Sequence, residues 1–170
     1  DAKSTAMYTA APGNLEFVQY DLSQPPNAPP VRRVRREGVI RCLHGSADGS
    51  SFAVGSGSAE GEAIVIYRPD GDSFKEVTRI EKLPMMLQKI RLSADGRAVY
   101  TQEAQSLRKW DISGLKAKEI KRPRGVDAVA VWDLSGDGRR LAILTGTGFT
   151  VWDITGPDPR PVGKLDGLNF

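Results

Sequence analysis

Short apolar runs separated by turn-forming residues recur in groups of four along most of the chain. One group spans residues 39–43, 51–54, 63–67 and 75–80. The next two groups span residues 87–92, 97–101, 107–110 and 116–121, and then residues 126–134, 139–144, 149–152 and 161–165. Apolar runs of this length, bounded by Asp, Gly and Ser, are typical of β-strands. The pattern therefore predicts an all-β chain built from four-stranded units.

A turn motif marks the first connection in each of these units. Ser-Ala-Asp-Gly at residues 46–49 returns at residues 93–96, and Ser-Gly-Asp-Gly follows at residues 135–138. The aspartates of the motif, Asp48, Asp95 and Asp137, lie 47 and 42 residues apart. Because Asp and Gly both tolerate a positive φ, Asp-Gly between two apolar runs predicts a two-residue hairpin turn.

A second motif ends the third run of each unit. Trp110-Asp111 recurs 42 residues later as Trp152-Asp153, whereas Tyr20-Asp21 and Tyr67-Arg68 stand at this place in the first two units. Together with the Ser-x-Asp-Gly turns, the Trp-Asp dipeptides resemble the WD-repeat β-propeller family, whose blades each have four antiparallel strands. The resemblance covers essentially all 170 residues.

This resemblance implies an all-β propeller segment of about four blades, at residues 1–36, 37–83, 84–124 and 125–170. We expect Trp110 and Trp152 to be buried between adjacent blades, because large aromatic side chains stabilise such interfaces. No unit has the Gly-His dipeptide that usually precedes the innermost strand of a blade. The connections at residues 102–106 and 146–148 also lack the family's aspartate, so the hydrogen-bonded tetrad of such blades is predicted to be incomplete.

The repeat register places both ends of the chain in the innermost strand of a blade. Residues 6–9 align with residues 98–101, and residues 167–169 match residues 125–127. We expect such ends from cuts in a longer repeat array. An open arc of four blades would leave two apolar faces in water. Two solutions would cover these faces: further blades, on the same chain or on another protein, or a second copy that closes an eight-blade ring. We favour further blades.

Composition narrows the class of protein. Hydrophobic residues make up 39% of the chain and charged residues 26%, which is ordinary for a soluble globular domain. No apolar run reaches the length of a membrane span. Cys42 is the single cysteine, so neither a disulfide within the chain nor a structural zinc cluster is predicted, and no cofactor is expected. The compartment stays open, although the absence of disulfides favours a cytoplasmic one.

Basic residues cluster on two predicted outermost strands. They are Arg32, Arg33, Arg35 and Arg36, and then Lys116, Lys118, Lys121, Arg122 and Arg124. Such clusters suit a nucleic-acid or acidic partner, and they equally protect an exposed edge strand from pairing with another chain. Aromatic residues do not interleave with these charges, so a base-stacking platform for nucleic acid is not predicted.

Three polar residues, His44, Arg91 and Asp133, share one position of the predicted innermost strands. Because the innermost strands of a propeller surround its central channel, the resemblance implies that these side chains line a channel. We expect Arg91 and Asp133 to form an ion pair. His44 is the single histidine, and no nucleophile motif accompanies it, so a catalytic triad is not predicted.

One face of the predicted propeller is the candidate partner surface. The loops after the second and fourth strands of a blade lie on the same face, and residues 55–62 lengthen one of them. The candidate partner-binding residues on this face are Ser56, Ser58, Glu60, Glu62, Met85, Met86, Gln102, Glu103 and Arg124. The sequence favours a non-enzymatic protein-interaction scaffold. The alternatives are a basic-rimmed module for nucleic acid or an acidic partner and, less favoured, a propeller enzyme.

Overall fold

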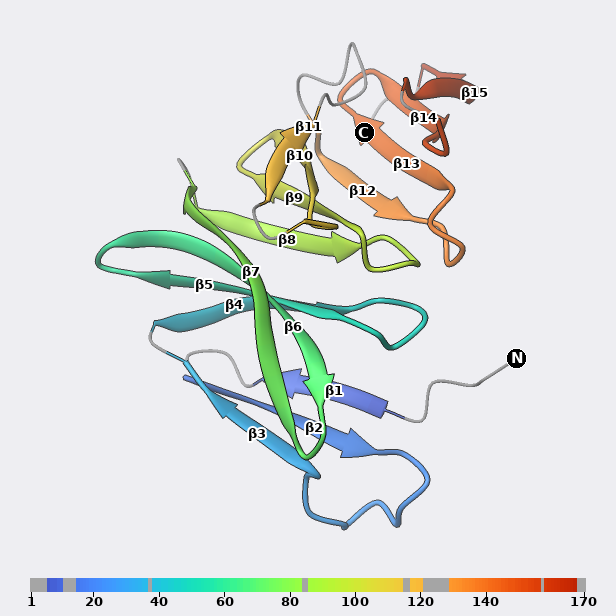
Figure 1. Ribbon diagram of the computed structural model, residues 1–170. Helices are drawn as coiled ribbons and strands as arrows, with labels where there is room; N and C mark the ends of the chain where they lie inside the picture. The colour runs from blue at the N-terminus through green and yellow to red at the C-terminus, as the bar shows by residue number, and fades with distance from the viewer. Residues whose placement is uncertain are drawn as a thin grey trace.

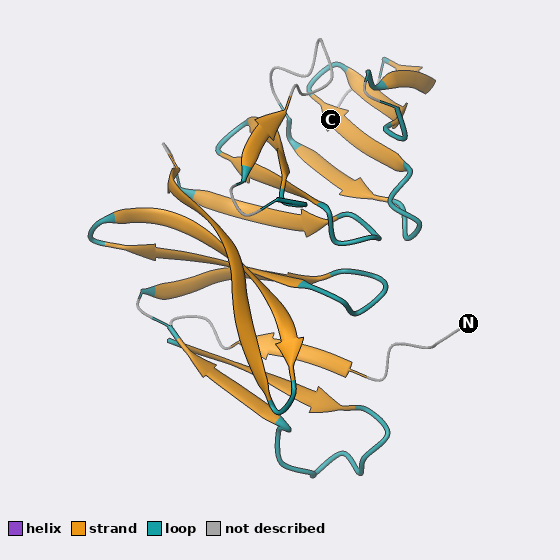
Figure 2. Cartoon of the chain, in the orientation of Figure 1, coloured by secondary structure: helices purple, strands orange, loops and turns teal. Residues whose placement is uncertain are grey.

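A computed structural model describes residues 6–10, 15–36, 38–83, 86–114, 117–120, 129–156 and 158–167. These residues form fifteen strands and no helix (Figure 2). The prediction of an all-β chain is therefore confirmed for the part of the chain that the structure describes.

The strands form four antiparallel sheets that follow one another in chain order (Figure 1). The first sheet contains β1 (Ala6–Ala10), β2 (Glu16–Asp21) and β3 (Arg32–Arg35). The second contains β4 (Val39–Gly45), β5 (Phe52–Ser58), β6 (Gly61–Asp70) and β7 (Ser73–Leu83). The third contains β8 (Leu87–Leu92), β9 (Ala98–Glu103), β10 (Ser106–Asp111) and β11 (Lys118–Ile120). The fourth contains β12 (Val131–Leu134), β13 (Arg140–Thr145), β14 (Gly148–Asp153) and β15 (Arg160–Asp166).

Each sheet is an up-and-down meander in which every strand pairs with its neighbours in the sequence. The strands coincide with the predicted apolar runs within a few residues, apart from β12, which begins at Val131 rather than at residue 126. The first sheet has β1 at its edge, where the other three sheets have an additional inner strand, β4, β8 or β12. This arrangement agrees with the predicted register, in which the first unit starts in its second strand.

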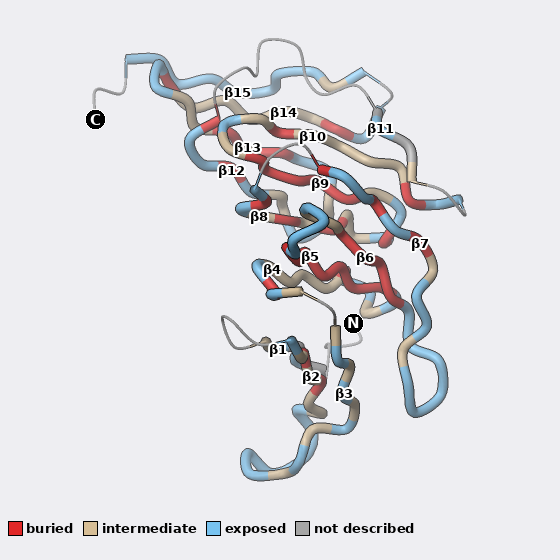
Figure 3. Tube along the Cα trace, turned by 90° about the vertical axis from the view of Figure 1, so that its left-hand side faces the viewer, coloured by how far each residue is buried: buried red, intermediate tan, exposed pale blue. Residues whose placement is uncertain are grey.

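Apolar side chains fill the spaces between successive sheets. The cluster between the first and second sheets contains the aromatic residues Phe17, Phe52 and Tyr67. Ile64, Ile66, Leu87 and Ile90 belong to the cluster between the second and third sheets. Tyr100, Trp132, Leu141 and Ile143 belong to the cluster between the third and fourth sheets. The core is thus a series of layers between sheets, and burial is heaviest in the middle of the series (Figure 3).

The Ser-x-Asp-Gly motif forms the same turn three times. In the third sheet, the Gly96 N–H donates to the Ser93 carbonyl oxygen at 3.0 Å, and Ser93 Oγ donates to Asp95 Oδ1 at 2.6 Å. Gly96 has a φ of +63°, whereas Asp95 does not adopt a positive φ. The predicted two-residue Asp-Gly hairpin is wrong, because five residues connect β8 to β9 and glycine alone supplies the left-handed conformation.

Tight two-residue turns instead join the second and third strands of the later sheets, at residues 59–60, 104–105 and 146–147. The segment 55–62, predicted as a long loop, is therefore a hairpin in which β5 and β6 stay paired up to Ser58 and Gly61. In the third sheet the turn places Ala104 at a φ of +52°. Most of the predicted loop residues 102–106 accordingly belong to β9 and β10.

The Ser-x-Asp-Gly turns of neighbouring sheets also lie against one another. A Cβ atom added to Gly138 would lie 2.8 Å from the backbone nitrogen of Ala94, in the preceding turn. One added to Gly96 would lie 3.0 Å from the Ser51 Oγ atom, next to the turn before it. The glycines thus serve two purposes, since they supply a positive φ and leave room for the adjacent turn.

The aspartate of the second motif caps the turn into the fourth strand. Asp153 Oδ1 accepts hydrogen bonds from the Thr155 N–H at 3.0 Å and from Thr155 Oγ1 at 2.6 Å. Asp111 accepts the same pair from Ser113, and Asp21 accepts it from Ser23. The motif is therefore Asp-x-Ser/Thr, a side-chain turn of the kind that these residues favour.

Trp110 and Trp152 occupy the same register, opposite Val99 and Leu141 respectively. Each packs against the apolar cluster between its own sheet and the preceding one, as predicted, but each is only partly buried there. Trp110 Nε1 donates to Thr101 Oγ1 at 3.1 Å. In the fourth sheet Ile143 stands two residues after Leu141, where Thr101 stands after Val99, and the buried Nε1 atom of Trp152 has no partner among the described residues.

The four sheets do not close into a ring within the described residues. The first and last sheets lie at opposite ends of the molecule (Figure 1). Both end sheets therefore keep one face that no other described sheet covers.

Candidate functional site

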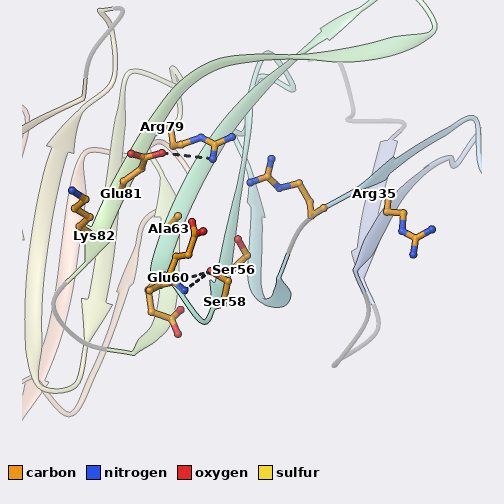
Figure 4. A pocket seen from close by; sticks show the side chains of 11 residues that line it. Arg35, Ser56, Ser58, Glu60, Ala63, Arg79, Glu81 and Lys82 are labelled. Atoms are coloured by element: carbon orange, nitrogen blue, oxygen red, sulfur yellow. Dashed lines mark hydrogen bonds and ion pairs between the residues drawn. The ribbon is translucent and has the colours of Figure 1, made fainter.

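A pocket of about 490 Å³ opens between the first and second sheets. Its lining residues come from the end of β3, the β5–β6 hairpin and the end of β7, namely Arg35, Arg36, Ser56, Ser58, Glu60, Gly61, Glu62, Ala63, Arg79, Glu81 and Lys82. Figure 4 shows Arg79 and Glu81 side by side on β7, with Ser56, Ser58 and Glu60 gathered at the β5–β6 end and Arg35 apart on β3.

The pocket arises from the alternation of side chains along the strands of the second sheet. On β5, Phe52 and Val54 point toward the first sheet and belong to the apolar cluster there. Ser56 and Ser58 continue the same alternation beyond this cluster, and both line the pocket. Because successive side chains on one face of a strand are two residues apart, the face changes from apolar to polar along its length.

Two arginines from different sheets meet at one carboxylate beside the pocket. Arg79 forms two hydrogen bonds with the Glu76 carboxylate, both at 2.9 Å, from Nε to Oε1 and from Nη2 to Oε2. Arg36 approaches the same carboxylate at 3.6 Å and donates to the Tyr67 hydroxyl at 2.7 Å. The pKa of Glu76 is lowered, mainly by the hydrogen bonds from Arg79, so this carboxylate stays ionised.

The pocket rim carries a bulge in β7. Glu62 pairs with Leu83 and Ile64 pairs with Ile80, so Glu81 and Lys82 on β7 oppose the single residue Ala63 on β6. Lys82 has a φ of +57°, which is uncommon for a residue other than glycine. Bulges redirect side chains locally, and here both bulge residues line the pocket.

Four predicted partner-binding residues, Ser56, Ser58, Glu60 and Glu62, line this pocket together. Glu62 is not a loop residue, because it lies in β6 and pairs with Arg41 at 2.8 Å. Met86 is exposed, with 55% of its surface accessible, and lies outside the pocket. Met85 and Arg124 lie outside the described residues.

The prediction that Gln102 and Glu103 lie on an exposed loop is wrong. Both belong to β9 and are buried, and Glu103 is only 1% exposed. Gln102 Oε1 accepts a hydrogen bond from Trp132 Nε1 at 2.9 Å, which links the third and fourth sheets. Glu103 accepts a hydrogen bond from Thr101 Oγ1 at 3.2 Å and faces Arg108 at 3.6 Å. Burial raises the pKa of Glu103.

The predicted ion pair between Arg91 and Asp133 is confirmed. Arg91 Nε lies 2.7 Å from Asp133 Oδ1, and Lys89 Nζ lies 3.4 Å from Asp133 Oδ2. The hydrogen bond from Arg91 is the main cause that lowers the pKa of Asp133 to about 2. These groups connect β8 to β12, at the inner edges of the third and fourth sheets.

His44 lies in the same region, and it lines a smaller pocket of about 200 Å³ with Arg91 and Asp133. The Leu92 N–H donates to His44 Nδ1 at 3.1 Å, so β4 is tied to β8 by a neutral imidazole. Burial, followed by the positive charge of Arg91, lowers the pKa of His44 to about 4. The structure thus brings the three predicted inner-strand residues together, in a setting that keeps the histidine uncharged at neutral pH.

The arginine cluster of the first sheet is engaged mainly within the protein. Arg32 donates to the Gly71 carbonyl oxygen and to Gln19 Oε1, and it lies over the Phe74 ring at 5.3 Å. Arg33 approaches Glu16 at 3.6 Å. With Arg36 held by Tyr67 and Glu76, three of the four arginines tie the first sheet together or to the long β6–β7 hairpin.

The described residues contain no group of three or more His, Cys, Asp or Glu that could hold a metal ion. Within the same residues there is no helix with the length and hydropathy of a membrane span. Cys42 is a partly buried free thiol, and burial raises its pKa to about 12. It is therefore almost entirely protonated at neutral pH, and a protonated thiol is a poor nucleophile.

Sequence reasoning missed the arginine pair and the bulge at the pocket. Arg36 and Glu76 are 40 residues apart in the sequence, and no local motif connects them. The local signal for the bulge is weak as well, since residues 79–82 read as an ordinary charged strand. No family model matches the chain, and no curated protein matches it significantly.

Proposed function

We propose that the chain is a segment of a β-propeller of the WD-repeat type, with blades at about residues 1–36, 37–83, 84–124 and 125–170, and that it acts as a non-enzymatic protein-interaction scaffold. The recurring Ser-x-Asp-Gly turn, the recurring Asp-x-Ser/Thr cap and the sequential four-stranded sheets support the assignment. A rigid series of sheets held together by apolar layers displays surface residues in fixed positions, which suits recognition of another protein.

The distribution of exposed apolar side chains carries this proposal. Among the described residues, seven of the nine large hydrophobic residues that are exposed lie on or beside the strands of the two end sheets. They are Met7, Leu15, Leu22 and Val31 in the first sheet, and Val131, Val162 and Leu165 in the fourth. Apolar surface that gathers in this way marks sites of protein association.

Nucleic-acid binding and catalysis, among the alternatives, find less support. A nucleic-acid rim needs free cations, whereas Arg32 and Arg33 have partners within the protein. An enzyme needs groups that converge on a reacting atom. The inner-edge residues His44, Arg91 and Asp133 instead form contacts between strands.

Light scattering over a wide range of protein concentration tests the proposal. We expect the wild-type chain to self-associate as concentration rises, because its end sheets have uncovered apolar faces. The double variant Val131→Glu/Leu165→Glu should shift association to higher concentration, since it places charges on one of these faces. Lys164→Glu is the matched control, because it changes charge on the same exposed strand and removes no apolar side chain. A wild type that stays monomeric throughout, like the variants, would contradict the proposal.

A further inference from the structure

We infer that the pocket between the first and second sheets binds an acidic segment of a protein partner, with a partner carboxylate seated between Arg36 and Arg79. This inference rests on the proposed function, because it names the chemistry of one partner. Its occupant is a short peptide segment that carries Asp or Glu.

The size and chemistry of the pocket suit a polar peptide. A volume of about 490 Å³ falls in the range of ordinary ligand sites. Its lining contains four basic residues, three acidic residues and two serines, and no aromatic side chain. Sites for drug-like small molecules are predominantly apolar, so this lining favours charged and hydrogen-bonding groups.

The local charge balance favours a carboxylate. Arg36 and Arg79 share the Glu76 carboxylate, whereas Arg35 and Lys82, which also line the pocket, form no ion pair with any described residue. Glu81 adds a contact to Arg79 at 3.7 Å, but its side chain is 60% exposed and the contact is weakened by solvent. A second carboxylate between the guanidiniums would complete the balance, because arginine binds carboxylates with paired, charge-assisted hydrogen bonds.

A hydrogen-bond donor without a partner at the pocket also favours an incoming carboxylate. Arg36 Nε is buried without an acceptor among the described residues. The Ser56 hydroxyl lines the pocket, and no described residue forms a hydrogen bond with it. The Ser56 hydroxyl can donate to an incoming oxygen, whereas Arg36 Nε is buried away from the pocket surface.

The backbone at Lys82 is a second, independent observation. A lysine at a φ of +57° is strained, and such strain gathers at ligand-binding positions. The bulge holds this cation on the rim of the pocket. Lys82 would thus attract the flanking acidic residue of the same peptide.

The acidic residues of the lining decide between an acidic peptide and nucleic acid. Glu60, Glu62 and Glu81 would repel a continuous phosphate backbone, and the lining offers no ring on which a base could stack. A peptide carries its negative charges at discrete positions, so it can place one carboxylate at the arginines and avoid the glutamates.

Fluorescence anisotropy with a fluorescein-labelled peptide of sequence Gly-Ser-Glu-Ser-Glu-Gly, whose two carboxylates stand at separate positions, tests this inference on the whole chain. Arg79→Gln should weaken binding by about tenfold, because it removes a charge-assisted contact. Lys82→Gly should weaken binding by about twofold to threefold, since a rim cation contributes less. Glycine adopts a positive φ freely, so this second variant keeps the fold even if Arg79→Gln does not.

Arg68→Gln is the matched control, because Arg68 lies on β6 of the same sheet and does not line the pocket. Equal binding by the wild type, Arg79→Gln and Arg68→Gln would overturn the inference. Tighter binding of hexalysine, or of an oligothymidylate that depends on Lys82, would also overturn it. The end-face variants used in light scattering lie outside the pocket, so failure of one proposal leaves the other measurable.

Discussion

The second sheet has two faces that differ sharply although the same strands build both. Toward the third sheet it presents Ala53, Ile64, Ile66, Ile80 and Leu83, all buried in one apolar cluster. Toward the first sheet it presents aromatic residues over one half and the charged pocket over the other. Neighbouring residues therefore have different environments: Ala63 lines the pocket, whereas Ile64 is fully buried.

This difference shows how one sheet packs against a neighbour on each side and still carries a charged pocket on one face. The face toward the third sheet is apolar over most of its length and ends in the Arg41–Glu62 ion pair, so apolar packing defines most of the spacing of the two sheets. The face toward the first sheet is held by an aromatic cluster and by Arg32 and Arg36, which reach the β6–β7 hairpin. Its remaining half is free to carry charge, because the fold does not need that half to be apolar.

The largest expected effect comes from the apolar face. Ile64→Ala should lower the free energy of unfolding by about 3 kcal/mol, since it leaves a cavity at a fully buried site. Ala63→Ser, one residue away on the pocket face, should change it by less than about 0.5 kcal/mol. Urea denaturation of both variants measures the contrast, and similar losses at the two positions would contradict the difference between the faces.

A second comparison uses the hydrogen bond of Trp110, which packs toward the second sheet. Thr101→Val keeps the shape of the side chain but removes the acceptor for Trp110 Nε1 and the donor to Glu103. We expect a loss of about 1.5 kcal/mol in the free energy of unfolding, because Thr101 is fully buried. The measurement is urea denaturation followed by tryptophan fluorescence, and an unchanged midpoint would rule out this role.

At the interface between the first and second sheets, Tyr67 occupies the position that Trp110 has in the third sheet. Its hydroxyl accepts a hydrogen bond from Arg36. Tyr67→Phe should cost about 1 kcal/mol, which is less than Thr101→Val, because Arg36 keeps its contact with Glu76. Hydrogen exchange should show faster opening of β1–β3 than of β8–β11 in this variant. Equal acceleration in both sheets would mean that Arg36 does not hold the first sheet specifically.

The last comparison depends on pH and belongs to the inner edge of the second and third sheets. The pKa of His44 is about 4 in the folded protein against an ordinary value of 6.5. Between these values the unfolded chain binds more protons, so the free energy of unfolding should fall as pH drops from about 6.5 to about 4. Protonation also removes the Nδ1 acceptor for the Leu92 N–H.

His44→Gln should flatten the pH dependence in that window, and urea denaturation at several pH values measures it. His44 is the single histidine, so no other imidazole contributes. Asp133 acts at lower pH, because its pKa is lowered to about 2 and its stabilising effect is lost only as pH falls below its ordinary value of 3.8 toward 2. An identical slope in the wild type and in His44→Gln would contradict the assignment.

Local patterns predicted the strands, their register and one long-range contact. The alignment of Arg91 with Asp133 succeeded because inner strands of successive sheets repeat in step, so equivalent positions become neighbours. The same reasoning failed for Gln102 and Glu103, because it inferred a loop of five residues where the chain makes a two-residue turn at residues 104–105. The tight turn, with Ala104 at a positive φ, places Gln102 and Glu103 in the core rather than at the surface.

The pocket could not be predicted because it depends on how two sheets meet. Arg36, Glu76 and Arg79 come together through the reach of the β6–β7 hairpin over the first sheet. Sequence spacing gives no measure of that reach. The unpartnered Nε1 atom of Trp152 has a local cause instead, because Ile143 on the adjacent strand stands where Thr101 supplies the acceptor in the third sheet.

The nested glycines of the Ser-x-Asp-Gly turns set the curvature of the molecule. Each turn leaves no room for a Cβ atom beside the turn before it, at Gly96 and again at Gly138. The Ser-x-Asp-Gly turns of neighbouring sheets therefore approach closely, while layers of apolar side chains separate the bodies of the sheets. A wedge-shaped unit of this kind bends any longer array in one direction, and alanine at either glycine would straighten the arc.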